Sequence, residues 1–330
     1  MPIDPKPGIR SRLFDADRPD DLLSTESVFS TRPTDRQLLW IDATGEVDAE
    51  TTRRLAEQLD LRPRTAQDLQ RTDKEPSVAL HRDYLHVRIA AEPNDDDPAD
   101  TAWLDLIAAP NVVISQHDRP IAFLDDVDRR IKADSASGIL SSVAFLTVLV
   151  DAAITSYHRA VDAIEEDVDR LDSRSLRAND RSDLLGDLVR CRRRIARLRQ
   201  LMADHRVVFT ALAAPDVGRL VDDPDATSML QGLSSRYEGA LAAVEASREA
   251  VLGSFDVFMS RTAQRTNEVM KVLTLATVLL LPGSLIAGLL GMNVVVPLSK
   301  DDPTSFWFVV VAIGVLALAI VVIARLRRWL

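Results

Sequence analysis

The chain has 330 residues, 27% of them charged, and a formal net charge of −10 at pH 7. Its length predicts more than one structural unit, and its acidic balance argues against a nucleic-acid partner, which would require a basic face. One cysteine, Cys191, excludes a disulfide framework or a thiolate metal cluster within one chain. The N-terminus lacks the apolar core of a signal peptide, so the charged part of the chain is expected in the cytoplasm.

The first part of the chain predicts an α/β domain over residues 36–140. Residues 1–35 are rich in Pro, Asp, Arg and Ser and are expected to be an irregular N-terminal segment. After them, short apolar runs typical of strands are mixed with segments of helical spacing. The predicted strands cover 38–42, 102–109 and 111–116 with a hairpin over 78–89, and the predicted helices cover 48–59, 64–70 and 121–131. Such a mixture indicates one domain built on a sheet.

Residues 141–271 predict a cytoplasmic helical hairpin followed by a stalk helix. A helix over 143–171 ends in acidic residues, and a helix over 182–212 carries six arginines between Arg190 and Arg199. An antiparallel hairpin would bring these opposite charges together. A third helix begins near Asp225 and meets no proline until Pro282. At about 1.5 Å per residue it would be roughly 90–100 Å long, and it would continue from the soluble part into a membrane.

Two uncharged apolar stretches, 272–290 and 306–324, follow. Each is long enough to cross the hydrocarbon core, about 30 Å thick, as a helix. Basic residues lie at 265 and 271 before the first stretch and in the tail 325–330 after the second, whereas the outer loop 291–305 has only Lys300. Because basic residues stay on the cytoplasmic side, both termini are expected in the cytoplasm. The two spans are expected in the inner membrane of the cell, with the outer loop on the other side.

Enzymatic function finds no support in the sequence motifs. The five histidines form no HxxxH or HExxH pair, and there is no glycine-rich phosphate loop, nucleophile elbow or Cys/His cluster. A large soluble part on two spans predicts a membrane transport protein instead, without an organic cofactor.

The first span carries a stripe of small and polar residues. Thr274, Thr277, Ser284 and Gly288 are spaced to share one helical face, which also includes Leu281 and extends back to Met270 and Asn267. Helix packing is the alternative use of such residues in membranes. The second span is almost uniformly apolar, which favours it as the lipid-facing helix and the first as the pore lining.

The chemistry of this stripe fits a hydrated cation. Neutral oxygens can hydrogen-bond the waters of an ion without stripping them, which suits Mg²⁺ because it dehydrates reluctantly. Met270, Leu273 and Leu281 could form apolar constrictions that close by dewetting. Two helices cannot enclose a pore, so several copies of the chain are required.

With these residues the sequence resembles the CorA family of divalent-cation channels. The matching segments are Thr266-Asn267-Glu268-Val269-Met270-Lys271-Val272-Leu273-Thr274, Pro282, Ile286-Ala287-Gly288, Gly291-Met292-Asn293 and Arg327-Arg328-Trp329-Leu330, with weaker matches at Trp40-Ile41-Asp42 and Asp83-Tyr84-Leu85. The resemblance covers essentially the whole chain and is strongest over residues 254–293.

The resemblance implies a homopentamer with an α/β/α cytoplasmic domain and Mg²⁺ uptake, with Co²⁺ and Ni²⁺ as further candidate ions. Asn293 would ring the outer mouth, and Gly291 and Met292 would shape its turn. The implied pore-lining residues are Asn267, Met270, Leu273, Thr274, Thr277, Leu281, Ser284 and Gly288. Asp256 would lie at the cytoplasmic mouth; an ordinary solvated charge is the alternative.

Two departures from the family pattern leave alternatives open. Asp68 matches one side of the family's regulatory Mg²⁺ site, but the stalk side, near 231–235, has no carboxylate. The outer loop also differs, and its Asp301 and Asp302 could attract cations or cap the second span. A Zn²⁺ transporter resembling ZntB, with or without proton coupling, is therefore the alternative function, and a membrane-anchored sensor that conducts nothing is a third.

Overall fold

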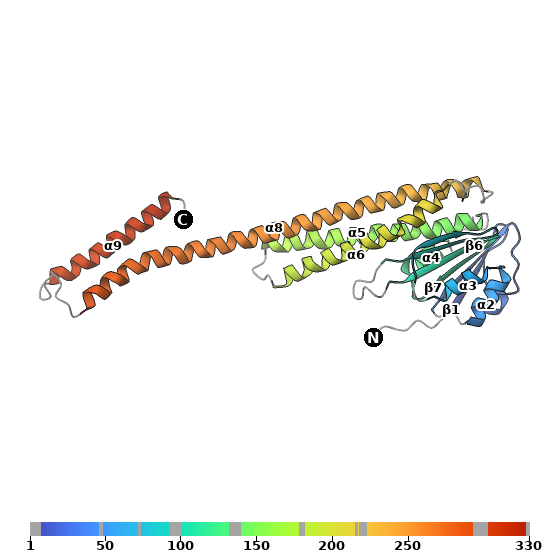
Figure 1. The fold of residues 1–330 in the computed structure, drawn as a ribbon, viewed down its shortest axis with the longest axis horizontal. Helices are drawn as coiled ribbons and strands as arrows, with labels where there is room; N and C mark the ends of the chain where they lie inside the picture. Colours follow the sequence, from blue (N-terminus) through green and yellow to red (C-terminus); the bar gives the residue numbers. More distant parts are fainter. Residues whose placement is uncertain are drawn as a thin grey trace. The chain divides into compact units, whose positions relative to one another are not determined.

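The chain has two compact units, Met1–Ser254 and Phe255–Leu330, in a computed structural model (Figure 1). The structure describes residues 8–45, 49–71, 74–92, 101–131, 140–177, 182–214, 217, 223–292 and 303–327. The long helix α8 (Pro224–Gly291) contributes residues to both units.

A seven-stranded sheet with the order β2-β1-β3-β7-β6-β5-β4 forms the centre of the first unit. Its strands are β1 (Gly8–Asp15), β2 (Asp21–Leu22), β3 (Gln37–Thr44), β4 (Ser77–Leu80), β5 (Leu85–Ala90), β6 (Trp103–Ala109) and β7 (Val112–His117). β3 pairs with β7 in parallel, and the remaining pairs are antiparallel. The strands and the hairpin predicted between residues 36 and 140 are confirmed.

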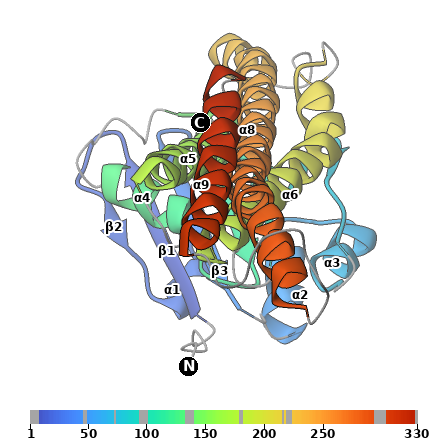
Figure 2. The same ribbon diagram turned by 90° about the vertical axis from the view of Figure 1, so that its left-hand side faces the viewer.

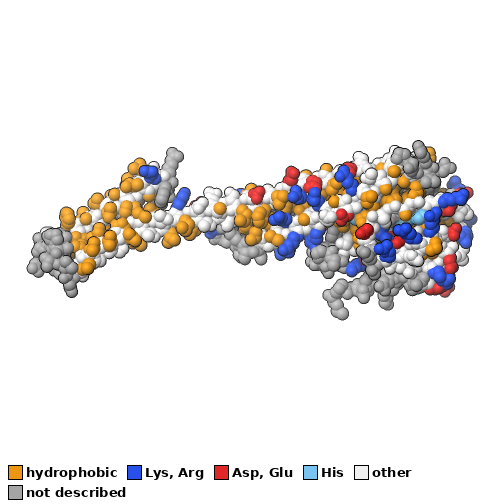
Figure 3. All heavy atoms as spheres, viewed as in Figure 1, with side chains coloured by type: hydrophobic (Ala, Val, Ile, Leu, Met, Phe, Trp, Pro, Cys, Tyr) orange, Lys and Arg blue, Asp and Glu red, His pale blue; other side chains and the backbone are white. Residues whose placement is uncertain are grey.

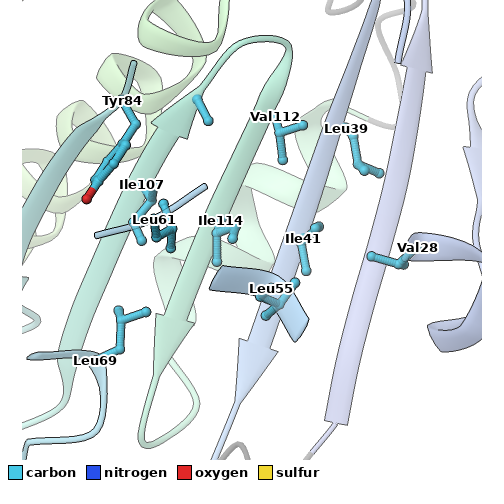
Figure 4. Packing of buried hydrophobic residues seen from close by; sticks show 11 residues of the cluster. Val28, Leu39, Ile41, Leu55, Leu61, Leu69, Tyr84, Ile107, Val112 and Ile114 are labelled. Atoms are coloured by element: carbon cyan, nitrogen blue, oxygen red, sulfur yellow. The ribbon is translucent and has the colours of Figure 1, made fainter. Parts of the chain in front are cut away.

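Helices cover both faces of this sheet. One face packs against α1 (Thr25–Val28), α2 (Ala49–Gln58) and α3 (Pro63–Leu69) through an apolar cluster that includes Ile41, Leu55 and Ile114 (Figure 4). The other face lies against α4 (Ala122–Ile131), α5 (Ser142–Arg177) and α6 (Ser182–Leu212). There the Trp40 ring meets the Phe145 ring of α5 edge-on, 5.4 Å between centroids. The predicted α/β/α fold is confirmed.

The expectation of an irregular segment over residues 1–35 is wrong for β1. All eight residues of β1 pair with β3, and Phe14 is fully buried against Phe145. The alternation typical of a strand is hidden because two arginines occupy the face that Phe14 shares. Arg10 pairs with Asp42 and Asp125, and Arg12 pairs with Asp128. These ion pairs with β3 and α4 form only in the folded chain.

Two buried carboxylates are held by ion pairs inside the sheet. Asp105 on β6 contacts Lys74 Nζ at 3.2 Å, His86 Nε2 at 2.9 Å and Arg88 Nε at 2.7 Å. Burial alone would raise the pKa of Asp105, but these partners hold it below its ordinary value. Asp42 on β3 behaves in the same way: despite its burial, hydrogen bonds from His117, Ser115 and Arg10 keep its pKa low.

The predicted α5–α6 hairpin is confirmed, including its opposite charges. Arg194 of α6 contacts Asp167 of α5 at 2.6 Å, and Arg174 of α5 contacts Asp187 of α6 at 3.3 Å. The first part of α8 packs beside this pair of helices, where the Tyr237 and Phe209 rings stack with centroids 4.2 Å apart.

The second unit consists of the C-terminal part of α8 and the antiparallel helix α9 (Pro303–Leu326) (Figures 1 and 2). Both helices contain a window long and apolar enough to cross a membrane, with mean hydropathy 2.1 in α8 and 3.1 in α9, and neither window is buried. On the face in view, Figure 3 shows hydrophobic side chains over this unit, with charged ones concentrated in the first unit.

Candidate ion pathway

The membrane-length part of α8 has one face directed toward α9. A Cβ added at Gly283 would lie 3.4 Å from Cγ2 of Ile313 in α9, so α9 packs against α8 at this glycine. The half-buried residues of this face are Leu275, Leu279, Pro282, Gly283, Ile286 and Leu290. At about 100° per residue, their directions fall within an arc of about 100°, so they lie on one side of the helix.

The predicted pore stripe lies on the opposite side of α8. At about 100° per residue, the mean direction of the stripe lies roughly 170° from that of the α9-facing residues. All eight predicted pore-lining residues, from Asn267 to Gly288, are exposed in the single chain. The face that α9 covers and the face with polar residues are therefore separate, and helix packing within one chain does not account for the stripe.

The three hydroxyls of the stripe point their protons at their own helix. Thr274 Oγ1 donates to Met270 O at 2.7 Å, Thr277 Oγ1 to Leu273 O at 2.9 Å and Ser284 Oγ to Leu280 O at 2.6 Å. A hydroxyl has one proton and two lone pairs. Because the proton is engaged with the backbone, each hydroxyl has only acceptor lone pairs left to present to its surroundings. Water molecules bound to a cation point their protons away from the ion, so such acceptors can hydrogen-bond them.

Large apolar side chains interrupt this polar stripe. Met270, Leu273 and Leu281 are 53%, 59% and 61% exposed, which makes them available to meet other copies of the chain. Pro282 lies one residue beyond Leu281 and has no N–H to donate to the carbonyl of Val278. Although this one helical hydrogen bond is missing, α8 continues through Pro282 to Gly291.

The two ends of the predicted pathway differ in what the structure describes. At the outer end, Gly291 is the last residue of α8 and Met292 is exposed, whereas Asn293, Asp301 and Asp302 lie outside the described residues. At the inner end, Asp256 is exposed on α8, eleven residues before Asn267. Eleven residues are close to three helical turns, so Asp256 lies on the same side of α8 as the stripe.

Asp68 lies near the end of α3, on the surface of the first unit. Its side chain is 27% exposed and its carboxylate lies 3.6 Å from Nη1 of Arg71. Its backbone carbonyl accepts a 2.6 Å hydrogen bond from Arg88, the same arginine that holds the buried Asp105. Asp68 is thus fixed in place by the core, although its carboxylate is accessible.

No metal-binding group of three or more His, Cys, Asp or Glu side chains occurs among the described residues of one chain. Asp223, the residue before Pro224, caps the N-terminus of α8. Its Oδ1 accepts from the backbone N–H of Asp225 at 3.0 Å and Ala226 at 3.2 Å. A hydrogen bond from Ser141, followed by these backbone bonds, lowers the pKa of Asp223.

The residues of α8 that contact α9 were not predicted from the sequence. Gly283 was the available signal, because a small residue inside an apolar span lets a neighbouring helix approach closely. That Gly283 lies opposite the polar stripe and faces α9 follows only from the contact with Ile313 in the folded structure.

Comparison with known proteins agrees with this architecture. Residues 35–328 match the family described as CorA-like Mg²⁺ transporter protein. The cobalt/magnesium transport protein CorA of Thermotoga maritima is 25% identical over 296 residues, which cover 88% of this chain and 83% of the relative. The divalent cation transporter CmaX of Pseudomonas aeruginosa is 30% identical over 239 residues, which cover 71% of this chain and 69% of the relative.

A solved structure with a similar fold is that of the CorA magnesium transporter from Methanocaldococcus jannaschii. Its TM-score is 0.76 with 19% sequence identity, and the match covers 98% of each chain. The chain belongs to the CorA-like Mg²⁺ transporter family. It is a divalent-cation transporter with two C-terminal membrane helices, and not an enzyme.

Proposed function

We propose that the chain forms a homopentameric channel that carries hydrated Mg²⁺ into the cytoplasm, with Co²⁺ and Ni²⁺ as further cargo. The stripe of α8 from Asn267 to Gly288 would line the pore, with Asn293 at the outer mouth and Asp256 at the cytoplasmic mouth. One observation carries this proposal: the stripe is exposed, uncharged and opposite to the face that α9 covers. The count of five subunits rests on the family resemblance.

The neutral stripe favours a hydrated ion over a dehydrated one. Mg²⁺ holds its waters tightly, and acceptor lone pairs from Thr274, Thr277 and Ser284 can bind those waters. The basic residues that flank the spans would remain in the cytoplasm with both termini. Asp301 and Asp302 would attract cations to the outer loop.

Ion flux into liposomes that contain the purified chain tests this function. Mg²⁺, Co²⁺, Ni²⁺ and Zn²⁺ are compared side by side, with and without a pH gradient. Uptake of Mg²⁺ without a pH gradient is expected. The Zn²⁺ alternative, motivated by the altered loop after Asn293, predicts Zn²⁺ uptake driven by a pH gradient and no Mg²⁺ flux, which would exclude the Mg²⁺ channel.

Asn293→Ala separates a channel from a sensor that conducts nothing. A channel with Asn293 at its mouth loses flux or ion selection, because an amide that binds the first hydrated ion is removed. The matched control is Asn267→Ala at the other end of the stripe, where flux is expected to fall while selection among ions is kept. Unchanged flux in Asn293→Ala would contradict the assigned outer mouth.

Asp68 is the candidate for a regulatory Mg²⁺ site. Because one chain offers no group of three metal ligands among its described residues, such a site would have to be shared between copies. Asp68→Asn would then leave flux unchanged at low cytoplasmic Mg²⁺ and remove its inhibition at high cytoplasmic Mg²⁺. Equal inhibition of both proteins would remove Asp68 from the regulatory site.

A further inference from the structure

The α5–α6 hairpin contains a groove with a volume of about 970 Å³. Six arginines from the two helices line it: Arg170, Arg174, Arg190, Arg193, Arg194 and Arg197. Figure 3 shows basic side chains along these helices. In a chain with a net charge of −10, this concentration of positive charge is local and requires an explanation.

The described lining of the groove has more arginines than carboxylates. Asp167 and Asp187 are its acidic residues, so the formal charge of the described lining is a surplus of four positive charges, before any partners outside the lining are counted. Each of the two is shared: Asp167 pairs with Arg170 and Arg194, and Asp187 pairs with Arg174 and Arg190. Like charges held this close repel one another, and a multivalent anion would relieve that repulsion.

The shape and chemistry of the groove indicate the kind of anion. Guanidinium groups bind phosphate oxygens in a fixed bidentate geometry. The volume lies within the usual range for small-molecule sites, about 300–1,000 Å³. Leu171 and Ala196 add apolar surface to the lining, which can contact a non-phosphate part of the ligand. A lipid phosphodiester brings only about one negative charge, which is too few for this surplus.

We propose that this groove binds a soluble polyphosphate anion of about the size of a nucleoside triphosphate. The site lies on the hairpin beside α8, where Arg199 of α6 contacts Glu245 of α8 at 2.5 Å and Ser254 of α8 contacts Asp172 of α5 at 3.0 Å. A bound anion would thus stiffen the two helices that pack on the stalk. Binding itself is independent of whether the chain conducts Mg²⁺.

Calorimetric titration of the full chain in phosphatidylcholine nanodiscs tests the proposal. The probes are inorganic tripolyphosphate and ATP, each with EDTA present so that metal binding does not contribute. The wild type is expected to bind both. Arg170→Gln combined with Arg193→Gln removes one guanidinium from each wall and is expected to weaken binding about tenfold or more.

The matched control carries the same charge change outside the groove. Arg192→Gln combined with Arg248→Gln alters exposed residues of α6 and α8 that do not line the site, and it is expected to bind within about threefold of the wild type. Melting temperatures of both double variants check that the fold is intact. Equal loss of binding in both double variants would mean that binding depends only on the net charge of the protein, and it would contradict a site in this groove.

Two further outcomes overturn the proposal. One is that the wild type binds neither probe at millimolar concentration. The other is that the melting temperature of the wild type rises in phosphatidylglycerol nanodiscs but not with the soluble probes, and that the Arg170/Arg193 double variant shows no such rise. This result would assign the groove to a lipid headgroup. Binding of the soluble probes in phosphatidylcholine nanodiscs supports the soluble ligand.

Discussion

In the proposed pathway, the hydroxyl groups of α8 are the neutral groups that would bind a hydrated cation. Thr274, Thr277 and Ser284 satisfy their protons on their own backbone and leave lone pairs exposed. A carboxylate at these positions would bind the ion more strongly, and conduction requires that the ion also leave. The proposed pathway therefore depends on acceptors of moderate strength.

Thr277→Val tests this view at a single atom. Valine keeps the shape of threonine but removes the oxygen, so Mg²⁺ flux is expected to fall up to about tenfold, the equivalent of one hydrogen bond. Liposome flux measures the effect. Thr262→Val is the matched control, because Thr262 bonds Phe258 O at 2.9 Å in the same way but lies before the apolar stretch 272–290. A loss of flux with Thr262→Val but not with Thr277→Val would contradict the role assigned to Thr277.

Asp105 is expected to be indispensable for the stability of the first unit. Asp105→Asn removes the carboxylate that Lys74, His86 and Arg88 share while those groups stay buried. Breaking such a buried pair costs about 3–5 kcal/mol, which corresponds to a drop of about 10 °C in melting temperature for a unit of this size. Asp162→Asn, an exposed change on α5, is the control and should leave the melting temperature unchanged.

The same carboxylates predict how stability depends on pH. The pKa values of Asp42 and Asp105 are lowered in the folded state, so the unfolded chain binds protons first. Their stabilisation is complete above about pH 5 and is lost as the pH falls below about 4. Melting temperatures of the full chain across this range should decline, and Asp105→Asn should show a shallower decline than the wild type.

At the scale of the element, the membrane-length part of α8 has two faces with different surroundings. The Gly283 side packs on α9, and the Gly288 side is free in one chain, since an added Cβ at Gly288 meets no described atom within 4 Å. One continuous helix of 68 residues also leads from the first unit into the membrane-length segment of the second. Movement of its first part can therefore reach the proposed pore without crossing a hinge loop.

Substitutions at the two glycines should separate these roles. Gly283→Leu is expected to push against Ile313, loosen α9 and lower the melting temperature in detergent by several degrees, because overpacking costs about 1–3 kcal/mol. Gly288→Ala is expected to leave the melting temperature unchanged and to reduce flux by narrowing the pore. If Gly288→Ala instead destabilised the protein without changing flux, the stripe would be a packing surface.

At the scale of the whole molecule, one chain cannot form the pathway. Two helices enclose no pore, and the face proposed to line it is fully open in one chain. The exposed apolar side chains of α8 and α9 must meet either lipid or other copies. Assembly around a symmetry axis would bury the stripe residues toward a shared centre and leave the outer face of α9 to lipid.

Engineered cysteines can test which residues face that centre, and mass spectrometry can count the copies around it. Cys191→Ser removes the only cysteine of the chain. In that background, Leu281→Cys is expected to form oxidised cross-links between copies in liposomes, because the residue would face the pore. Leu318→Cys on α9, 64% exposed, serves as the lipid-facing control. Native mass spectrometry of the purified assembly should give five subunits; any other number would correct the proposed stoichiometry.

Most of the fold could be predicted from residue spacing. Short apolar runs predicted the strands between Gln37 and His117, and helical spacing predicted α8 and the α5–α6 hairpin. β1 could not be predicted in this way. In the sequence, its arginines are typical of exposed, solvated residues. In the fold they pair with Asp42, Asp125 and Asp128, which lie 32 to 116 residues away along the chain.

By itself, the sequence determined the kind of protein: a charged N-terminal part, two apolar spans, and a polar stripe followed by the Gly-Met-Asn motif. Periodicity and composition are local properties, so they can be read along the chain. Only the tertiary structure decided that the stripe lies opposite α9, that Asp68 is tied to the core through Arg88, and that six arginines share one groove. These facts depend on contacts between distant segments, which no local pattern encodes.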